Sequence, residues 1–473
     1  MKYRQRIFLE IVKEADKTDR HIMLRRKIYE QLRNWKATSQ GTSALMIEGA
    51  RRVGKSFIVE EFAKREYASY LFINFTTAPE AVKDWFGQYM DNLDQLLMNL
   101  QLYYNKRLES RQSLIVFDEV QDCPKAREAI KFLVADGRFD YIETGSLVSI
   151  KSKVKGINIP SEEDVIEMFP LDFEEFLWAM GNDMLMAHIK DCFIRQQPIG
   201  QQMHRKAMDI FRLYMVVGGM PQAVQEYVNS KDFEKVEAVK HRILTLYRND
   251  IRKYADKEEL KVTAIFDEIP GQLQKHEKKF TLATLGSDAR MRDYQNAFLW
   301  LSDAKIINCA FNTTEPSFGL RLNDERSTLK CYMADTGLLI SHAFDENGKV
   351  PIEVYQKLIL GKLEINEGMI VENIVAQMLT ASGHRLYFYS NPDRENKDNR
   401  MEIDFLIAKS KITGKHNISP IEVKSGKNYA LTSLKKCIKK YHDYLSTPYV
   451  THTRDLMLAD GIVYIPLYMI PLL

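Results

Sequence analysis

Short apolar runs alternate along the first third of the chain with stretches in which apolar residues recur every three or four positions. The short runs are typical of strands buried on both faces, and the longer period is typical of amphipathic helices. The helix expected just before the first strand covers residues 22–37. Strands that alternate with helices predict an α/β fold with a doubly wound parallel sheet. The expected strands are 44–48, 69–75, 114–117, 141–144 and 165–169.

The pattern changes near residue 171, where the strand signal stops. Helical spacing continues to about residue 254, with one break at Gly218-Gly219-Met220-Pro221. Residues 259–340 are expected to form three helices and then a hairpin of two short strands, 306–311 and 329–333. Helices followed by a small hairpin predict a winged helix, for which we favour a structural role over DNA reading.

A second α/β pattern follows residue 348, with strands at 385–389, 402–408, 419–424 and 462–465 and helices at 368–379 and 431–445. We therefore predict four domains. They are the sheet domain with its N-terminal helix at 1–178, a helical domain at 179–256, a winged helix at 257–345 and a terminal α/β domain at 346–473.

Composition indicates an ordinary globular chain that is large enough for several cores. Of the 473 residues 45% are hydrophobic and 28% are charged, and the formal net charge of +3 gives no general indication of nucleic-acid binding. The five cysteines are scattered and include no C-x-x-C pair, which argues against a disulfide framework and a zinc site. The N-terminus lacks an apolar signal-peptide region, and the apolar run 461–473 is too short to span a bilayer. We expect a cytoplasmic protein without a membrane partner.

A phosphate loop is predicted between the first strand and the next helix, because the sequence there matches G-x-x-x-x-G-K-[ST]. Its glycines let consecutive backbone N–H groups face a phosphate, and the helix N-terminus adds unpaired donors. Lys55 is expected to reach the β- and γ-phosphates, and Ser56 to bind Mg²⁺. The sequence thus predicts ATP or ADP and Mg²⁺ as cofactors. The expected nucleotide-binding residues are Gly49, Ala50, Arg51, Arg52, Val53, Gly54, Lys55, Ser56 and Phe57.

Two carboxylates follow the strand 114–117, at the edge where ligands bind in open α/β sheets. Asp118 is expected to hold Mg²⁺ beside Ser56, and Glu119 to act as the base or orienter for an attacking water. Thr144 closes the strand that should lie between the other two. Its hydroxyl, or that of Ser146, either contacts the γ-phosphate or water, or belongs to a strand-ending turn. The candidates for an arginine finger are Arg51, Arg52, Arg138 and Arg248.

These motifs resemble a prokaryotic group of AAA-like P-loop NTPases, specifically ATPases, whose C-terminal half carries a restriction-endonuclease-like domain. The resemblance rests on the phosphate loop and on the segments 117–121, 143–146, 169–176, 217–221 and 335–338. It implies a parallel sheet of order 5-1-4-3-2, a helical lid, a winged helix and a terminal nuclease-like fold. It also implies that Pro221 packs on the adenine, whereas Gly-Gly and Pro alone already explain a helix break there.

The terminal α/β pattern carries a second group of candidate residues. Glu422 and Lys424 alternate onto one face of a strand, and Asp404 lies on the strand expected beside it. This arrangement looks like the PD-(D/E)-x-K nuclease core, in which carboxylates bind Mg²⁺ and lysine stabilises the attacked phosphate. Glu372, on the preceding helix, matches the helical acid that some such enzymes use. The leading Pro-Asp is absent, so a nuclease and a binding module that only retains these residues both remain open.

Three functions fit these motifs. The first is a Mg²⁺-dependent ATPase whose lid and terminal domain move with the nucleotide state. The second is a DNA-directed enzyme in which ATP controls a nuclease, with the lysines of helix 431–445 as candidates for binding a phosphate backbone. The third is a non-enzymatic switch that holds ADP or ATP and signals through protein contacts. DNA or other nucleic acid is a candidate partner, and the sequence leaves the oligomeric state open.

Overall fold

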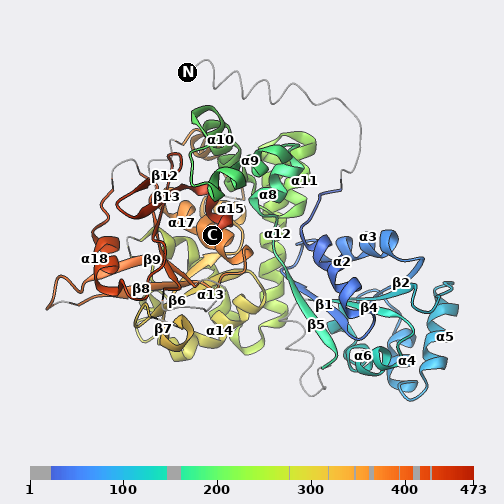
Figure 1. Ribbon diagram of the computed structural model, residues 1–473. Helices are drawn as coiled ribbons and strands as arrows, with labels where there is room; N and C mark the ends of the chain where they lie inside the picture. The colour runs from blue at the N-terminus through green and yellow to red at the C-terminus, as the bar shows by residue number, and fades with distance from the viewer. Residues whose placement is uncertain are drawn as a thin grey trace. The chain divides into compact units, whose positions relative to one another are not determined.

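A computed structural model describes residues 23–145, 161–275, 277–317, 319–345, 348–361, 367–393, 395–408, 416–426 and 429–473, so Ser146 lies outside the described residues. The chain divides into two compact units, whose elements are labelled in Figure 1. The N-terminal unit comprises residues 26–169 with 303–305, and the C-terminal unit comprises essentially the rest from residue 170 onward.

The N-terminal unit is built on a five-stranded parallel sheet of order β2-β3-β4-β1-β5. This order is the predicted 5-1-4-3-2 counted from the other edge, so the prediction is confirmed. Because all strands are parallel, their carboxyl ends meet at one edge, which includes the end of β1. The strands are β1 Ala44–Gly49, β2 Ser69–Asn74, β3 Ser113–Asp118, β4 Asp140–Gly145 and β5 Glu163–Met168.

Helices cover both faces of this sheet: α2 and α3 lie on one side, and α4 and α6 on the other (Figure 1). Proline begins α6 at its first position, where its missing N–H costs nothing, and Gly137 ends it in the left-handed region. The helices are α2 Ile28–Ser39, α3 Lys55–Glu66, α4 Glu80–Gln88, α5 Leu93–Tyr103, η1 Val120–Asp122 and α6 Pro124–Asp136.

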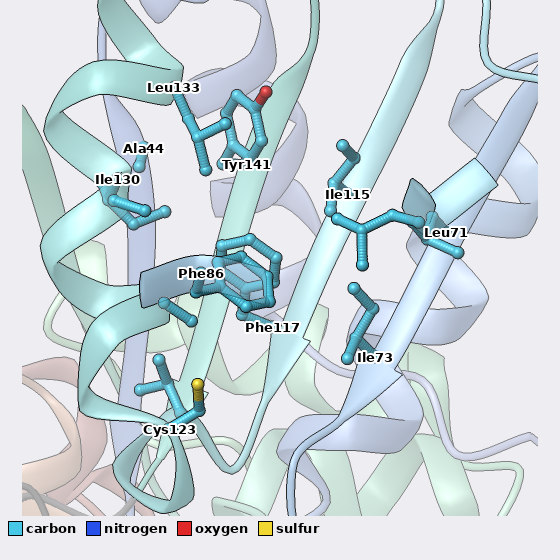
Figure 2. Packing of buried hydrophobic residues seen from close by; sticks show 14 of the residues in the cluster. Ala44, Leu71, Ile73, Phe86, Ile115, Phe117, Cys123, Ile130, Leu133 and Tyr141 are labelled. Carbon is cyan, nitrogen blue, oxygen red and sulfur yellow. The ribbon is translucent and has the colours of Figure 1, made fainter. Parts of the chain in front are cut away.

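The core between the sheet and α4, α5 and α6 explains why the strand runs are apolar throughout. All six residues of β3 are buried. Phe117 of β3 meets Phe86 of α4 edge to face, with ring centroids 5.3 Å apart, and Phe75 packs against Phe86 at 5.5 Å. Figure 2 shows Phe86 and Phe117 together, with Ile115, Ile130 and Tyr141 around them. Burial on this scale fixes the positions of the strands, and therefore the positions of the residues at their carboxyl ends.

The C-terminal unit begins with helices. Asp172 and Glu175 form a reciprocal capping box at the start of α8. Helix α10 ends before Gly218 and helix α11 begins at Pro221, so the helical region is interrupted where the sequence predicts. None of the described helices is long and apolar enough to cross a lipid bilayer. The helices are α8 Phe173–Ala179, α9 Asp183–Ile194, α10 Gln201–Val217, α11 Pro221–Ser230, α12 Phe233–Tyr254, η2 Asp256–Glu258, α13 Glu259–Gln274, η3 Leu282–Thr284, α14 Met291–Asp303, η4 Leu320–Asn323, α15 Thr336–Ala343, α16 Ile352–Ile359, α17 Glu367–Ala381, α18 Thr432–Tyr441 and η5 Leu467–Leu472.

The same unit holds an eight-stranded mixed sheet of order β12-β13-β11-β10-β9-β8-β6-β7. Strand β9 is antiparallel to both of its neighbours, β8 and β10, whereas β10, β11 and β13 are parallel. The strands are β6 Ile307–Thr313, β7 Asp324–Met333, β8 Tyr387–Asn391, β9 Met401–Ala408, β10 Ile418–Val423, β11 Tyr449–His452, β12 Met457–Ala459 and β13 Ile462–Pro466.

The hairpin β6–β7, expected as the wing of a winged helix, is instead part of this sheet. Strand β6 pairs in parallel with β8 through Phe311, Asn312 and Thr313. The Asn312 side-chain oxygen also accepts the backbone N–H of Ser390 at 2.9 Å. The predicted boundary at residue 345 is therefore not a boundary of the sheet, because its strands come from both sides of it. Strands β11 and β12 were not predicted.

Candidate functional site

The phosphate loop, residues 49–56, joins the end of β1 to the start of α3. Gly54 has φ 98°, and a Cβ on Gly49 would lie 2.4 Å from the carbonyl oxygen of Met168 on β5. Neither position accepts a side chain without strain. Arg52 also has a positive φ, 69°. The two glycines are therefore required by the path of the backbone itself.

Lys55 is buried at the first position of α3. Its Nζ donates to the carbonyl oxygens of Gly49 at 2.9 Å and Ala50 at 3.0 Å. Burial lowers the pKa of this lysine, and the nearby carboxylates of Glu119 and Asp118 oppose the shift. The ammonium group thus lies against the inside of the loop, where a phosphate held by the loop would meet it.

Asp118, at the end of β3, connects three elements of the sheet edge. Its Oδ1 accepts the Ser56 hydroxyl at 2.6 Å and the Thr144 hydroxyl at 2.5 Å. Its Oδ2 accepts Asn74 Nδ2 at 2.6 Å. The structure therefore brings Thr144 to the pair of Ser56 and Asp118, which the sequence predicts side by side. Asn74 was missed, although it ends the predicted second strand and pairs in register with Asp118.

Glu119 has a left-handed backbone conformation, with φ 54°. Such a conformation costs a residue other than glycine about 1–2 kcal/mol, and strain of this kind concentrates at functional sites. The Glu119 N–H donates to the Thr144 hydroxyl at 3.3 Å, and the Glu119 carboxylate accepts Gln121 Nε2 at 2.5 Å. Gln121 is buried and was not predicted as a site residue. Glu119, the predicted base, is thus held by the short 3-10 turn that follows it, η1.

Arg26, another residue that the sequence analysis missed, ties the phosphate loop to the end of β5. Its guanidinium donates to the carbonyl oxygen of Val53 at 3.1 Å and to that of Phe169 at 2.6 Å. Arg26 is buried although it comes before α2 begins. Its position in the sequence, among other basic residues ahead of a helix, gives no signal of this role.

These residues fit a nucleotide with Mg²⁺. The loop has an ammonium group at its inside, and the Ser56 hydroxyl and the Asp118 carboxylate supply the oxygen ligands that Mg²⁺ takes. Arg51, Arg52 and Phe57 of the predicted nucleotide-binding set are exposed at the loop. Pro221 belongs to the C-terminal unit, and its adenine contact stays a prediction.

The second group of candidates lies on α17, β9 and β10. Asp404 Oδ2 accepts the backbone N–H of Val423 at 2.8 Å, and Lys424 pairs with Glu422 at 2.7 Å. The two predicted strands are therefore neighbours. Burial and the Asp404 carboxylate raise the pKa of Glu422 to about 8, although Lys424 opposes the shift.

Glu372 is buried on α17 among basic and phenolic groups. It contacts Lys278, lies 3.3 Å from Lys330 Nζ and accepts the Tyr332 hydroxyl at 2.5 Å. Burial alone would raise the pKa of Glu372, but the ammonium groups of Lys330 and Lys278 outweigh it and lower this pKa to about 2. Lys330 was not predicted, although a lysine inside the apolar run 329–333 was a signal for it. Among the residues that the structure describes, no three His, Cys, Asp or Glu side chains form a group that can hold a metal ion.

Comparisons with known proteins agree with the fold of the N-terminal unit. Residues 41–177 match a family described as an AAA domain. This match, the sheet order and the phosphate loop support an AAA-like P-loop fold for the N-terminal unit. Residues 208–347 and 367–470 match two families described as domains of unknown function.

Several solved structures are similar to this chain at low identity, whereas no curated protein matches it. The Walker-type ATPase PABY2304 of Pyrococcus abyssi is 13% identical with a TM-score of 0.41, and the match covers 70% of this chain and 99% of that one. The Aeropyrum pernix ORC2 protein is 15% identical with a TM-score of 0.33, covering 75% of this chain and 98% of that one. At these values neither likeness bears on function.

Proposed function

We propose that the chain binds ATP with Mg²⁺ at the phosphate loop and hydrolyses it by attack of water on the γ-phosphate. The observation that carries this proposal is the hydrogen-bonding of Asp118. Its carboxylate joins the loop hydroxyl of Ser56 to the ends of two neighbouring strands, at Thr144 and Asn74. Such a carboxylate beside a loop serine is the arrangement that holds Mg²⁺ on nucleotide phosphates.

Each residue then has a distinct role. Lys55 binds the β- and γ-phosphates, and Ser56 with Asp118 holds Mg²⁺, which neutralises phosphate charge when bound. Glu119 orients the attacking water and takes its proton, because it follows Asp118 at the sheet edge. The Thr144 hydroxyl donates to the Asp118 carboxylate and accepts the backbone N–H of Glu119, so it fixes the positions of the two acidic residues relative to each other.

We further propose that the nucleotide state controls the C-terminal unit through residues 169–171. Arg26 holds Val53 of the loop and Phe169 together. Two residues later, Leu171 N–H donates to the Gly219 carbonyl at 2.7 Å, and the Leu171 carbonyl accepts the Tyr214 hydroxyl at 2.7 Å. A shift of the loop on nucleotide binding is thereby passed along the backbone to the helices that follow. DNA or another nucleic acid stays a candidate partner of that unit.

The test of hydrolysis is Glu119→Gln, which keeps the shape of the side chain and removes its basicity. We expect loss of phosphate release at saturating ATP with an unchanged dissociation constant for ATP by calorimetry. Glu128→Gln on α6, whose carboxylate pairs with Lys125 instead, is the matched control and should keep wild-type turnover. Turnover that persists in Glu119→Gln places the base elsewhere.

The alternative is a non-enzymatic switch that holds ADP or ATP and signals through protein contacts. The hydrogen bond from Gln121 to Glu119 favours it, because a carboxylate that already accepts a hydrogen bond polarises water less. Under this alternative the purified protein carries slowly exchanging ADP and shows negligible turnover, and Gln121→Leu raises that turnover. Rapid turnover by the wild type rules the alternative out.

A further inference from the structure

A buried lysine lies among the carboxylates of the second candidate group. Lys330, on β7, is 1% exposed. Its Nζ is 3.3 Å from Glu372 Oε1, 3.1 Å from Glu402 Oε1 and 3.8 Å from Asp404 Oδ1. These carboxylates come from α17 and β9, so two separate elements converge on one ammonium group of β7. We refer to Glu372, Glu402 and Asp404 as the carboxylate cluster.

The position of this ammonium group is fixed by its surroundings. Lys330 pairs with Ala310 of β6, and its backbone bridges Lys279 on the other side. The Nζ also lies 5.1 Å from the centre of the Phe388 ring, which favours a cation. A swing of the side chain out of the cluster would take this ammonium group away from Glu402 and Asp404, whose side chains are partly buried, and this is unfavourable.

Lysines compensate most of the negative charge of the cluster and of Glu422 without a metal ion, because three ammonium groups face four carboxylates. Lys278 and Lys424 add two further ammonium groups, one on Glu372 and one on Glu422. Three lysines thus face the three carboxylates of the cluster and Glu422. A divalent ion takes carboxylate oxygens at about 2.0–2.6 Å, and it would have to share these oxygens with an ammonium group of the same sign a few ångströms away.

We propose that the Lys330 ammonium group is the resident cation of the carboxylate cluster, in the place that a divalent metal would take. The nuclease-like arrangement of Asp404, Glu422 and Lys424 then does not fit a metal, and the C-terminal unit cleaves no nucleic acid through it. The side chains serve to lock β7 onto α17 and β9. This inference is independent of nucleotide hydrolysis at the phosphate loop.

The test uses Mn²⁺ as the probe on the full chain without nucleotide, counted by electron paramagnetic resonance. Wild type and Asp404→Asn should bind the same number of Mn²⁺ ions. Lys330→Met, which keeps the length and removes the charge, should bind about one more, and Lys330→Met with Asp404→Asn should lose it again. Tb³⁺ emission sensitised by Tyr332, whose hydroxyl contacts Glu372, should rise in Lys330→Met alone.

Lys278→Met is the matched control, because it removes the other lysine on Glu372 and leaves Lys330 in place. It should gain no Mn²⁺. The proposal is overturned if wild type binds more Mn²⁺ than Asp404→Asn, or if a folded Lys330→Met gains none. It is also overturned if wild type cleaves DNA or RNA with Mg²⁺ and Asp404→Asn does not. The wild-type and Asp404→Asn comparison decides the matter even where Lys330→Met fails to fold.

Discussion

The substitution Asp118→Asn replaces one oxygen by nitrogen in the most connected side chain of the phosphate-loop site. The remaining oxygen can still accept the hydroxyls of Ser56 and Thr144. The new nitrogen, however, faces Asn74 Nδ2, which lies 2.6 Å from the present oxygen. Asn74 cannot simply turn its amide, because its Oδ1 accepts the Thr76 N–H at 3.0 Å. Two donors therefore meet in a buried position.

Two magnitudes follow from this geometry. A buried donor left without an acceptor costs about 1–3 kcal/mol, so the free energy of unfolding should fall by that amount. The loss of a carboxylate that supports a metal lowers affinity about 10–100-fold, so the Mg²⁺ midpoint of ATP turnover should rise by the same factor.

The second substitution, Asn74→Asp, separates these two effects. In the double variant a carboxylate at position 74 accepts from the amide at position 118 and still accepts the Thr76 N–H, so most of the stability should return. Asn74→Asp alone places two carboxylates face to face and should be less stable than wild type. The coupling energy between the two positions should be about 1–3 kcal/mol. The Mg²⁺ midpoint should stay high, because position 118 remains uncharged.

Urea unfolding of the four proteins measures the stability terms, and phosphate release against Mg²⁺ concentration measures the second effect. Wild-type stability in Asp118→Asn would contradict the hydrogen bond to Asn74. A double variant with the wild-type Mg²⁺ midpoint would show that Asp118 does not hold the metal.

Two further predictions concern buried acids. Burial, then Glu163 beside it, raises the pKa of Glu143 well above its usual value despite the nearby guanidinium of Arg127. The folded chain therefore keeps a proton that the unfolded chain releases above pH about 4.5, and stability falls as pH rises. Glu143→Gln should lessen this loss by up to about 1.4 kcal/mol per pH unit between pH 5 and 8 in urea unfolding, and equal slopes would refute it. Asp335 accepts the N–H of Gly219 at 2.6 Å and that of Leu338 at 2.9 Å. Asp335→Ala should cost about 1–3 kcal/mol for each amide left unpaired, Asp335→Asn should cost less, and thermal unfolding with no difference between them would count against this.

The N-terminal unit was largely predictable because its signals are local. Apolar runs mark the strands, the glycine pattern marks the loop, and Asp118 follows its strand directly. The partners that orient these residues were not predictable in the same way. Asn74 reaches Asp118 only through the register of β2 with β3, and Arg26 reaches the loop from well before it in sequence. Whether a single sequence reveals a functional residue therefore depends on how far its partner lies along the chain, and not on the residue type.

The C-terminal unit was harder to predict, because the sequence pattern of a hairpin is the same whether its edge strand is free or pairs with a further strand. The contact of Phe311 with Tyr387 that places β6 and β7 in the larger sheet is non-local, so Lys330 was assigned to a different domain from Glu372 and Asp404. Nevertheless, the lysine inside the apolar run 329–333 indicated that this strand has carboxylate partners. An ammonium group costs several kcal/mol to bury unless carboxylates surround it. A lysine in a buried strand therefore requires carboxylates from elsewhere in the chain, and α17 and β9 supply them.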